Sequence, residues 1–151
     1  MKTISSWTYE HAKASGINIL DNRAIDIACY HPGYTFVEKL QNIATKFRKE
    51  QEGGSTKVNF MRQYYDIYCL LENKQVLDFI GTEAYFKHKE KRFPKADKEI
   101  SIDQNQAFIL SDETLRNSFV ERYQKTAALY YNGQPAFDKL MERLKKYLDQ
   151  L

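Results

Sequence analysis

The sequence contains little glycine, proline or cysteine, and each shortage excludes a class of protein. With 6 Gly and 3 Pro in 151 residues, the chain is neither collagen-like nor a disordered low-complexity polypeptide. Its 2 cysteines, Cys29 and Cys69, each lie in an apolar run. This pattern fits buried, reduced thiols better than a disulfide framework or a metal site, and it favours a cytoplasmic protein.

The chain also lacks long apolar runs and a strong charge of one sign. No run approaches the ~18 apolar residues of a membrane-spanning helix, and no basic leader followed by an apolar segment opens the sequence. We therefore expect no membrane partner and no secretion by that route. The 23 basic and 20 acidic residues leave a net charge of +3, which is too mild to indicate a nucleic-acid-binding protein by itself.

The composition and length indicate one ordered, helix-rich domain over residues 1–151. Apolar residues make up 42% of the chain, and its 11 Tyr and 9 Phe predict an aromatic core. We expect a predominantly helical α+β fold with about five helices and a short two- or three-stranded β element near the N-terminus.

The β element is expected in a β-rich start over residues 1–34. Residues 2–10 and 24–30 are rich in β-branched and aromatic side chains and predict two short strands. A third short strand is expected at residues 107–110, "AFIL". Two strands do not form a stable sheet alone, so the first two need partners.

Two helical regions follow, over residues 35–92 and 111–151. Thr35, with Glu38 three residues later, predicts a capping box. In the first region we expect helices over about residues 35–49, 60–71 and 74–92. In the second, Ser111 is expected to cap one helix, which Gly133 ends, and Pro135 to start another, which together form an antiparallel hairpin.

Lys39 lies at the border of the apolar stripe of the first of these helices, between Phe36 and Ile43. Two interpretations are open. Its stem lies along the core rim with the ammonium in water, or the ammonium faces an anion in a cleft. Arg62 and Asp66, one turn apart on the next helix, form either an exposed ion pair or a part of the same site.

Four stretches together resemble the later part of the AbiEii/AbiGii toxin family of nucleotidyltransferases, from about residue 4 to the end of the sequence. They are "HPGYTFVEKL", "FMRQYYDIYCLL", "YFKHKEKRFP" and "FVERYQKTAALYYNGQPAFDKLMERL". Each is unspecific alone, but they occur in the order of the family.

The resemblance implies a bacterial toxin of a toxin–antitoxin or abortive-infection system, which transfers a nucleotide from a nucleoside triphosphate (NTP) to an RNA acceptor such as tRNA, with Mg²⁺. An antitoxin protein is the implied partner. The motif lysine of the family matches Lys39, and its arginine and aspartate match Arg62 and Asp66. It implies catalytic roles for Lys39 and Asp66, and phosphate binding by Lys39 and Arg62.

The sequence departs from the family before residue 35, where the Gly-Ser turn and the paired metal-binding carboxylates are missing. We therefore expect no firm Mg²⁺ site, and a chain that is inactive or dependent on a partner. Gly54-Ser55 followed by Asp66 mimics the missing motif, but Tyr68 stands where the second carboxylate belongs. Asp26 is either a metal-binding strand carboxylate or a solvent-facing residue.

A basic segment ends the third expected helix. Lys87, Lys89, Lys91 and Arg92 are candidates for RNA binding, although such a run is more often a solvated face. The three histidines are not at ligand spacing, so no zinc site is expected. The alternative function is a non-catalytic helical module that binds RNA or an antitoxin protein.

Overall fold

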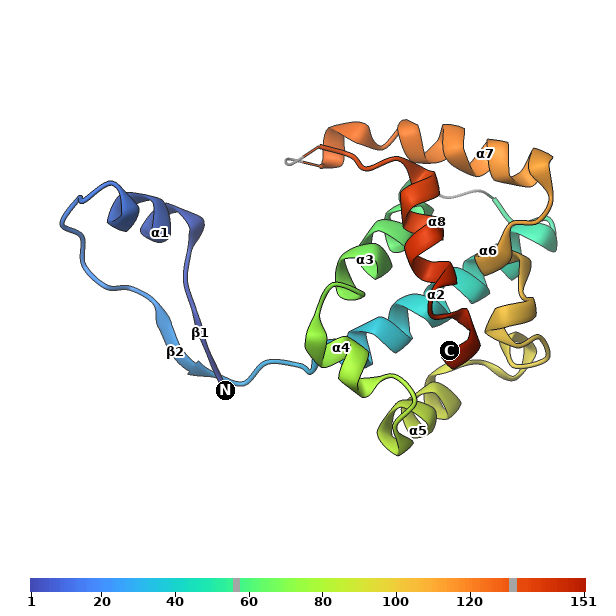
Figure 1. Ribbon diagram of the computed structural model, residues 1–151, viewed down its shortest axis with the longest axis horizontal. Helices are drawn as coiled ribbons and strands as arrows, with labels where there is room; N and C mark the ends of the chain where they lie inside the picture. The colour runs from blue at the N-terminus through green and yellow to red at the C-terminus, as the bar shows by residue number, and fades with distance from the viewer. Residues whose placement is uncertain (56–57, 131–132) are drawn as a thin grey trace. The chain divides into compact units, whose positions relative to one another are not determined.

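A computed structural model describes residues 1–55, 58–130 and 133–151. Contacts divide the chain into two compact units, Met1–His31 and Pro32–Leu151. The prediction of one domain over residues 1–151 stays a prediction. The described residues form eight α-helices and a two-stranded antiparallel sheet (Figure 1), so the prediction of about five helices is wrong.

The first unit contains β1 (Lys2–Ile4), α1 (Trp7–Ala14) and β2 (Ala24–Ile27). The strands are antiparallel, and all their side chains are exposed. The two predicted short strands are present, but the first ends at Ile4 and does not extend to residue 10. Ser6 caps a helix there: its side chain accepts a hydrogen bond from Tyr9 N at 3.1 Å. Asp26 is exposed on β2, in a left-handed conformation with φ of 54°.

Helix α2 (Pro32–Gln51) crosses the middle of the second unit (Figure 1) and packs against α3 (Arg62–Leu70), α4 (Lys74–Phe79) and α5 (Glu83–Arg92). It begins at Pro32 and not after a Thr35 cap, because proline suits the first turn, where its missing N–H is not needed. The predicted apolar stripe is confirmed, since Phe36, Leu40 and Ile43 are fully buried.

The helix expected over residues 74–92 is two helices. Gly81 adopts a φ of +78° between them, and the Thr82 side chain then accepts a hydrogen bond from Tyr85 N as the cap of α5. The expected strand at residues 107–110 is likewise wrong. Asn105 caps the short helix α6 (Gln106–Ile109) by accepting a hydrogen bond from Ala107 N at 2.9 Å.

Helices α7 (Glu113–Gln124) and α8 (Phe137–Lys145) complete the unit. Asp112 caps α7 in place of the expected Ser111, and α8 packs mainly on α3 and α6. The part of the chain that the structure describes also has five 3₁₀ turns: η1 (Val58–Phe60), η2 (Lys95–Asp97), η3 (Ile102–Gln104), η4 (Ala127–Leu129) and η5 (Leu148–Gln150). In the described residues, no helix combines the length and the apolarity needed to cross a membrane.

Aromatic rings form the centre of the core, as the composition predicted. Tyr64 lies edge-on to Phe119 and Phe137, with ring centroids 6.0 and 5.4 Å away, and its hydroxyl donates to Ala107 O at 2.8 Å. Cys29 and Cys69, expected to be buried, are free and exposed. Cys69 is exposed because it lies two residues after the buried Ile67, on the opposite side of α3.

Burial of three tyrosines predicts that the protein loses stability at alkaline pH. Burial raises the pKa of Tyr64 well above its usual value of 10.0, and it also raises the pKa of Tyr85 and Tyr123. The folded state therefore favours the neutral phenols, a contribution that is complete below pH 10 and is lost as the pH rises above it. We expect the midpoint of urea unfolding to fall steadily above about pH 10. A phenolate absorbance that develops fully near pH 10 while the protein stays folded would contradict this.

Candidate functional site

The structure brings Lys39 of α2 and Asp66 of α3 into direct contact. Lys39 Nζ lies 2.7 Å from Asp66 Oδ2. The Lys39 side chain is 26% exposed and the Asp66 side chain is 23% exposed. Lys39 and Asp66 are 27 positions apart in the sequence, and the packing of α2 on α3 brings them together. Lys39 therefore does not extend into open water, and its ammonium faces an anionic side chain.

Arg62 lies one helical turn before Asp66 and approaches its other oxygen. Arg62 Nε is 4.0 Å from Asp66 Oδ1, and the arginine side chain is 58% exposed. At that distance the contact is weak, and exposed pairs of this kind contribute about 0.3–0.5 kcal/mol. The Asp66 carboxylate thus lies between two cations. Lys39, Arg62 and Asp66 together carry one net positive charge, which would favour an anionic ligand.

The basic residues of α5 are placed in different environments. Lys89 is partly buried and donates a hydrogen bond to Leu151 O, and Arg92 Nε lies 3.5 Å from Glu38 Oε1. Lys87 and Lys91 are exposed, without a hydrogen-bond or ion-pair partner in the described ranges. The RNA-binding role of these four residues stays a prediction.

A second contact joins α2 to α5 directly beside Lys39. Glu38 Oε1 lies 3.6 Å from His88 Nε2 as well as close to Arg92. Sequence reasoning did not assign Glu38 or His88 to this place, because their proximity depends on how two helices pack. The one available signal was the spacing of His88 and Arg92, which are one turn apart and face the same side of α5.

A model of the family described as nucleotidyl transferase AbiEii toxin, type IV toxin–antitoxin system, matches residues 8–143. The chain belongs to this family. The resemblance read from the four sequence stretches is therefore confirmed. The match includes Lys39, Arg62 and Asp66, and it places the chain among nucleotidyltransferase-like toxins, whose partners are antitoxins. Neither the curated proteins nor the solved structures that were searched contain a match.

The residues of this AbiEii-family chain do not by themselves fit a Mg²⁺ site. Within residues 1–55, 58–130 and 133–151, no three or more His, Cys, Asp or Glu side chains are grouped in a way that could hold a metal ion. Asp66 offers a single carboxylate, and both of its oxygens face cations. Mg²⁺ requires oxygen ligands in near-octahedral geometry, so a metal here would need carboxylates from elsewhere.

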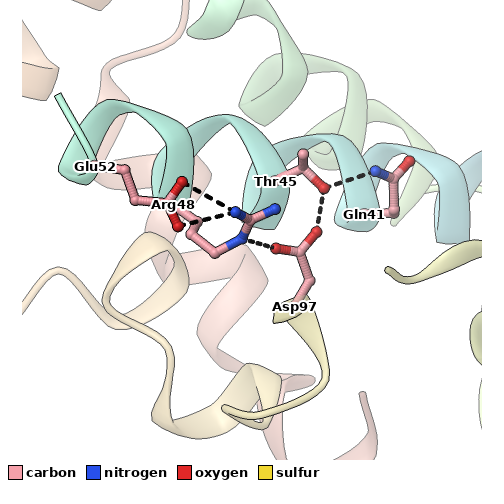
Figure 2. Close-up of polar contacts among 5 residues, drawn as sticks. All are labelled: Gln41, Thr45, Arg48, Glu52 and Asp97. Carbon is pink, nitrogen blue, oxygen red and sulfur yellow. Dashed lines mark hydrogen bonds and ion pairs between the residues drawn. The ribbon is translucent and has the colours of Figure 1, made fainter. Parts of the chain in front are cut away.

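Sequence reasoning also missed a buried polar cluster around Asp97, which Figure 2 shows. The Asp97 side chain, from η2, is 1% exposed; Arg48 Nε of α2 donates to it at 2.6 Å, and Thr45 donates to its other oxygen. Hydrogen bonds from Arg48 to Asp97 and Glu52 raise the pKa of the guanidinium. The cluster ties the turn that follows the basic helix to α2.

Replacement of Asp97 tests how much this cluster contributes to stability. Asp97→Ala leaves Thr45 and Arg48 without their buried acceptor, so we expect it to lower the free energy of unfolding by roughly 2–3 kcal/mol. Asp78→Ala is the matched control, because Asp78 pairs with Lys74 in an exposed contact whose loss costs less than about 1 kcal/mol. Urea denaturation measures both, and equal effects would contradict a structural role for Asp97.

Proposed function

We propose that this chain is the C-terminal part of a nucleotidyltransferase-like toxin that, when complete, transfers a nucleotide from an NTP to an RNA acceptor. The observation that carries the proposal is the contact between Lys39 and Asp66 at 2.7 Å, with Arg62 beside it. In the reaction, an acceptor hydroxyl bonds to the α-phosphorus, and pyrophosphate and the hydroxyl proton are released.

Lys39 is the proposed ligand of the triphosphate. An ammonium has three N–H donors, and the hydrogen bond to Asp66 uses one of them. Two donors remain for phosphate oxygens, in a position that the neighbouring helix holds. Asp66 is a positioning residue in this scheme, since it keeps the ammonium at one place on the α2–α3 border.

Arg62 is the proposed second phosphate ligand. Its contact with Asp66 is long and its side chain is largely exposed, so it can turn toward a bound phosphate at little cost. A guanidinium forms paired hydrogen bonds with phosphate oxygens. Lys39 and Arg62 together then supply two positive charges, against one negative charge on Asp66.

The chain alone is proposed to be inactive or dependent on a partner polypeptide. The Gly-Ser turn and paired carboxylates of the family do not occur before residue 35, and the described residues do not fit a metal site. We propose that a separate segment supplies the carboxylates for Mg²⁺, and that this chain binds the phosphates and the acceptor.

Calorimetric titration with each of the four ribonucleoside triphosphates tests the phosphate site. We expect at least one to bind, and Lys39→Ala to raise its Kd about tenfold or more, because a charge-assisted hydrogen bond is lost. Lys139→Ala, which removes an exposed lysine from α8, should stay close to the wild type.

Two results would contradict this proposal. One is that no triphosphate binds the wild-type chain, and the other is that Lys39→Ala and Lys139→Ala bind it equally well. Unfolding curves must show that both variants are fully folded at the temperature of the titration, because Lys39→Ala also removes a contact between helices.

A transfer assay separates the enzyme from the alternative of a non-catalytic binding module. Radiolabelled NTP, Mg²⁺ and tRNA are incubated with the chain, with and without a polypeptide that carries the Gly-Ser turn and the paired aspartates. We expect label on the RNA only in the complemented reaction and not with Lys39→Ala. RNA binding without any labelling under complementation would favour the binding module.

A further inference from the structure

A cavity of about 400 Å³ lies beside α5 in the second unit, and Lys39 is not among its lining residues. Its lining includes Phe86, Lys89, Phe93, Lys98, Ile100 and Ile102. The cavity therefore combines rings and aliphatic side chains with two lysines, and the carboxylates of Glu90 and Asp97 also belong to its lining. Its volume lies within the range of small-molecule sites.

Two of the lining side chains are apolar and exposed. Phe86 is 53% exposed and Ile100 is 55% exposed. Among the described residues of the second unit, the only other large apolar side chain that is comparably exposed is Leu129, at 49%. Exposed apolar groups that gather at a cavity are typical of a binding site, whereas single ones on a surface need no explanation.

The segment around the cavity is strongly basic. Residues 85–98 contain six basic and two acidic residues, a net charge of +4 against +3 for the whole chain. Asp97 forms an ion pair with Arg48, and Glu90 forms one with Lys98. Lys87, Lys91 and Lys95 have no ion-pair partner in the part of the chain that the structure describes.

We infer that this cavity receives an unstacked base of single-stranded RNA, with Phe86 as the stacking surface and Lys87 and Lys91 against the neighbouring phosphates. Proteins that bind single strands combine aromatic platforms with cations along the backbone of the nucleic acid. Lys89 adds a hydrogen-bond donor inside the cavity, and burial lowers the pKa of this lysine. An acidic peptide would satisfy the charge, but it would not require a planar ring.

The inference rests on the proposed function, because it specifies where the RNA acceptor binds. The two sites are connected through α2: Arg92, near the end of α5, approaches Glu38, and the next residue is Lys39. An RNA strand bound by α5 would thus lie along α2, the helix that carries Lys39. Lys39, Arg62 and Asp66 do not belong to the lining of the cavity.

Fluorescence anisotropy with a short labelled oligouridylate tests the cavity. We expect Phe86→Ala to raise the Kd about tenfold, whereas Phe86→Tyr keeps the affinity of the wild type and Phe86→Leu does not, because stacking requires a ring. Leu129→Ala is the matched control for loss of an exposed apolar side chain and should have no effect. Thermal unfolding is measured for each variant to show that the fold is retained.

An abasic oligonucleotide with the same number of phosphates separates base docking from charge. It should bind more weakly, and Phe86→Ala should not weaken it further. Lys87→Gln combined with Lys91→Gln should weaken both ligands and reduce the dependence of log Kd on log salt concentration. Equal losses for Phe86→Ala on both ligands, or competition by a glutamate-rich peptide as effective as that by RNA, would overturn the inference.

Triphosphate binding, measured on the same proteins, distinguishes the two proposals. RNA binding through Phe86 without any NTP binding would defeat the transferase proposal and leave base docking supported. NTP binding that depends on Lys39, with RNA binding that is unaffected by Phe86→Ala, would overturn only the base-docking inference.

Discussion

The burial of one face of α2 is the constraint on which the second unit depends. Phe36, Leu40 and Ile43 are fully buried because α3, α4 and α5 all pack against this helix. Charged side chains at the border of so buried a face lose water and need partners. Three therefore pair with different elements: Lys39 with Asp66 of α3, Glu38 with α5, and Arg48 with Asp97 of η2.

These border contacts explain how a packing helix also carries the candidate chemistry. The ion pair of Lys39 and Asp66 is only partly shielded, so its contribution to stability is modest, while two ammonium donors stay available. The contacts of Arg48 and Glu38 face other elements and hold η2 and α5 in place. One helix thus positions both the candidate phosphate site and the basic segment proposed to bind RNA.

Periodicity predicted the longer helices, but it did not predict where they begin or end. The stripe through Phe36 was readable because an apolar residue recurs at each turn. The division between α4 and α5 depends on the left-handed conformation of Gly81 and on the Thr82 cap, which interrupt a pattern that otherwise continues. The helix α1 was read as a strand because β-branched and aromatic residues fit both structures, and Ser6 decided between them.

The sequence by itself determined the family, through motifs that recur in order, and it indicated the residue types of the candidate site, Lys39, Arg62 and Asp66. Only the tertiary structure decided that Lys39 meets Asp66, that Arg62 stays largely exposed beside them, and that Asp97 is buried with Arg48. The reason is physical: local patterns determine which face of each helix is apolar, whereas contacts between residues far apart in sequence depend on how those faces pack together.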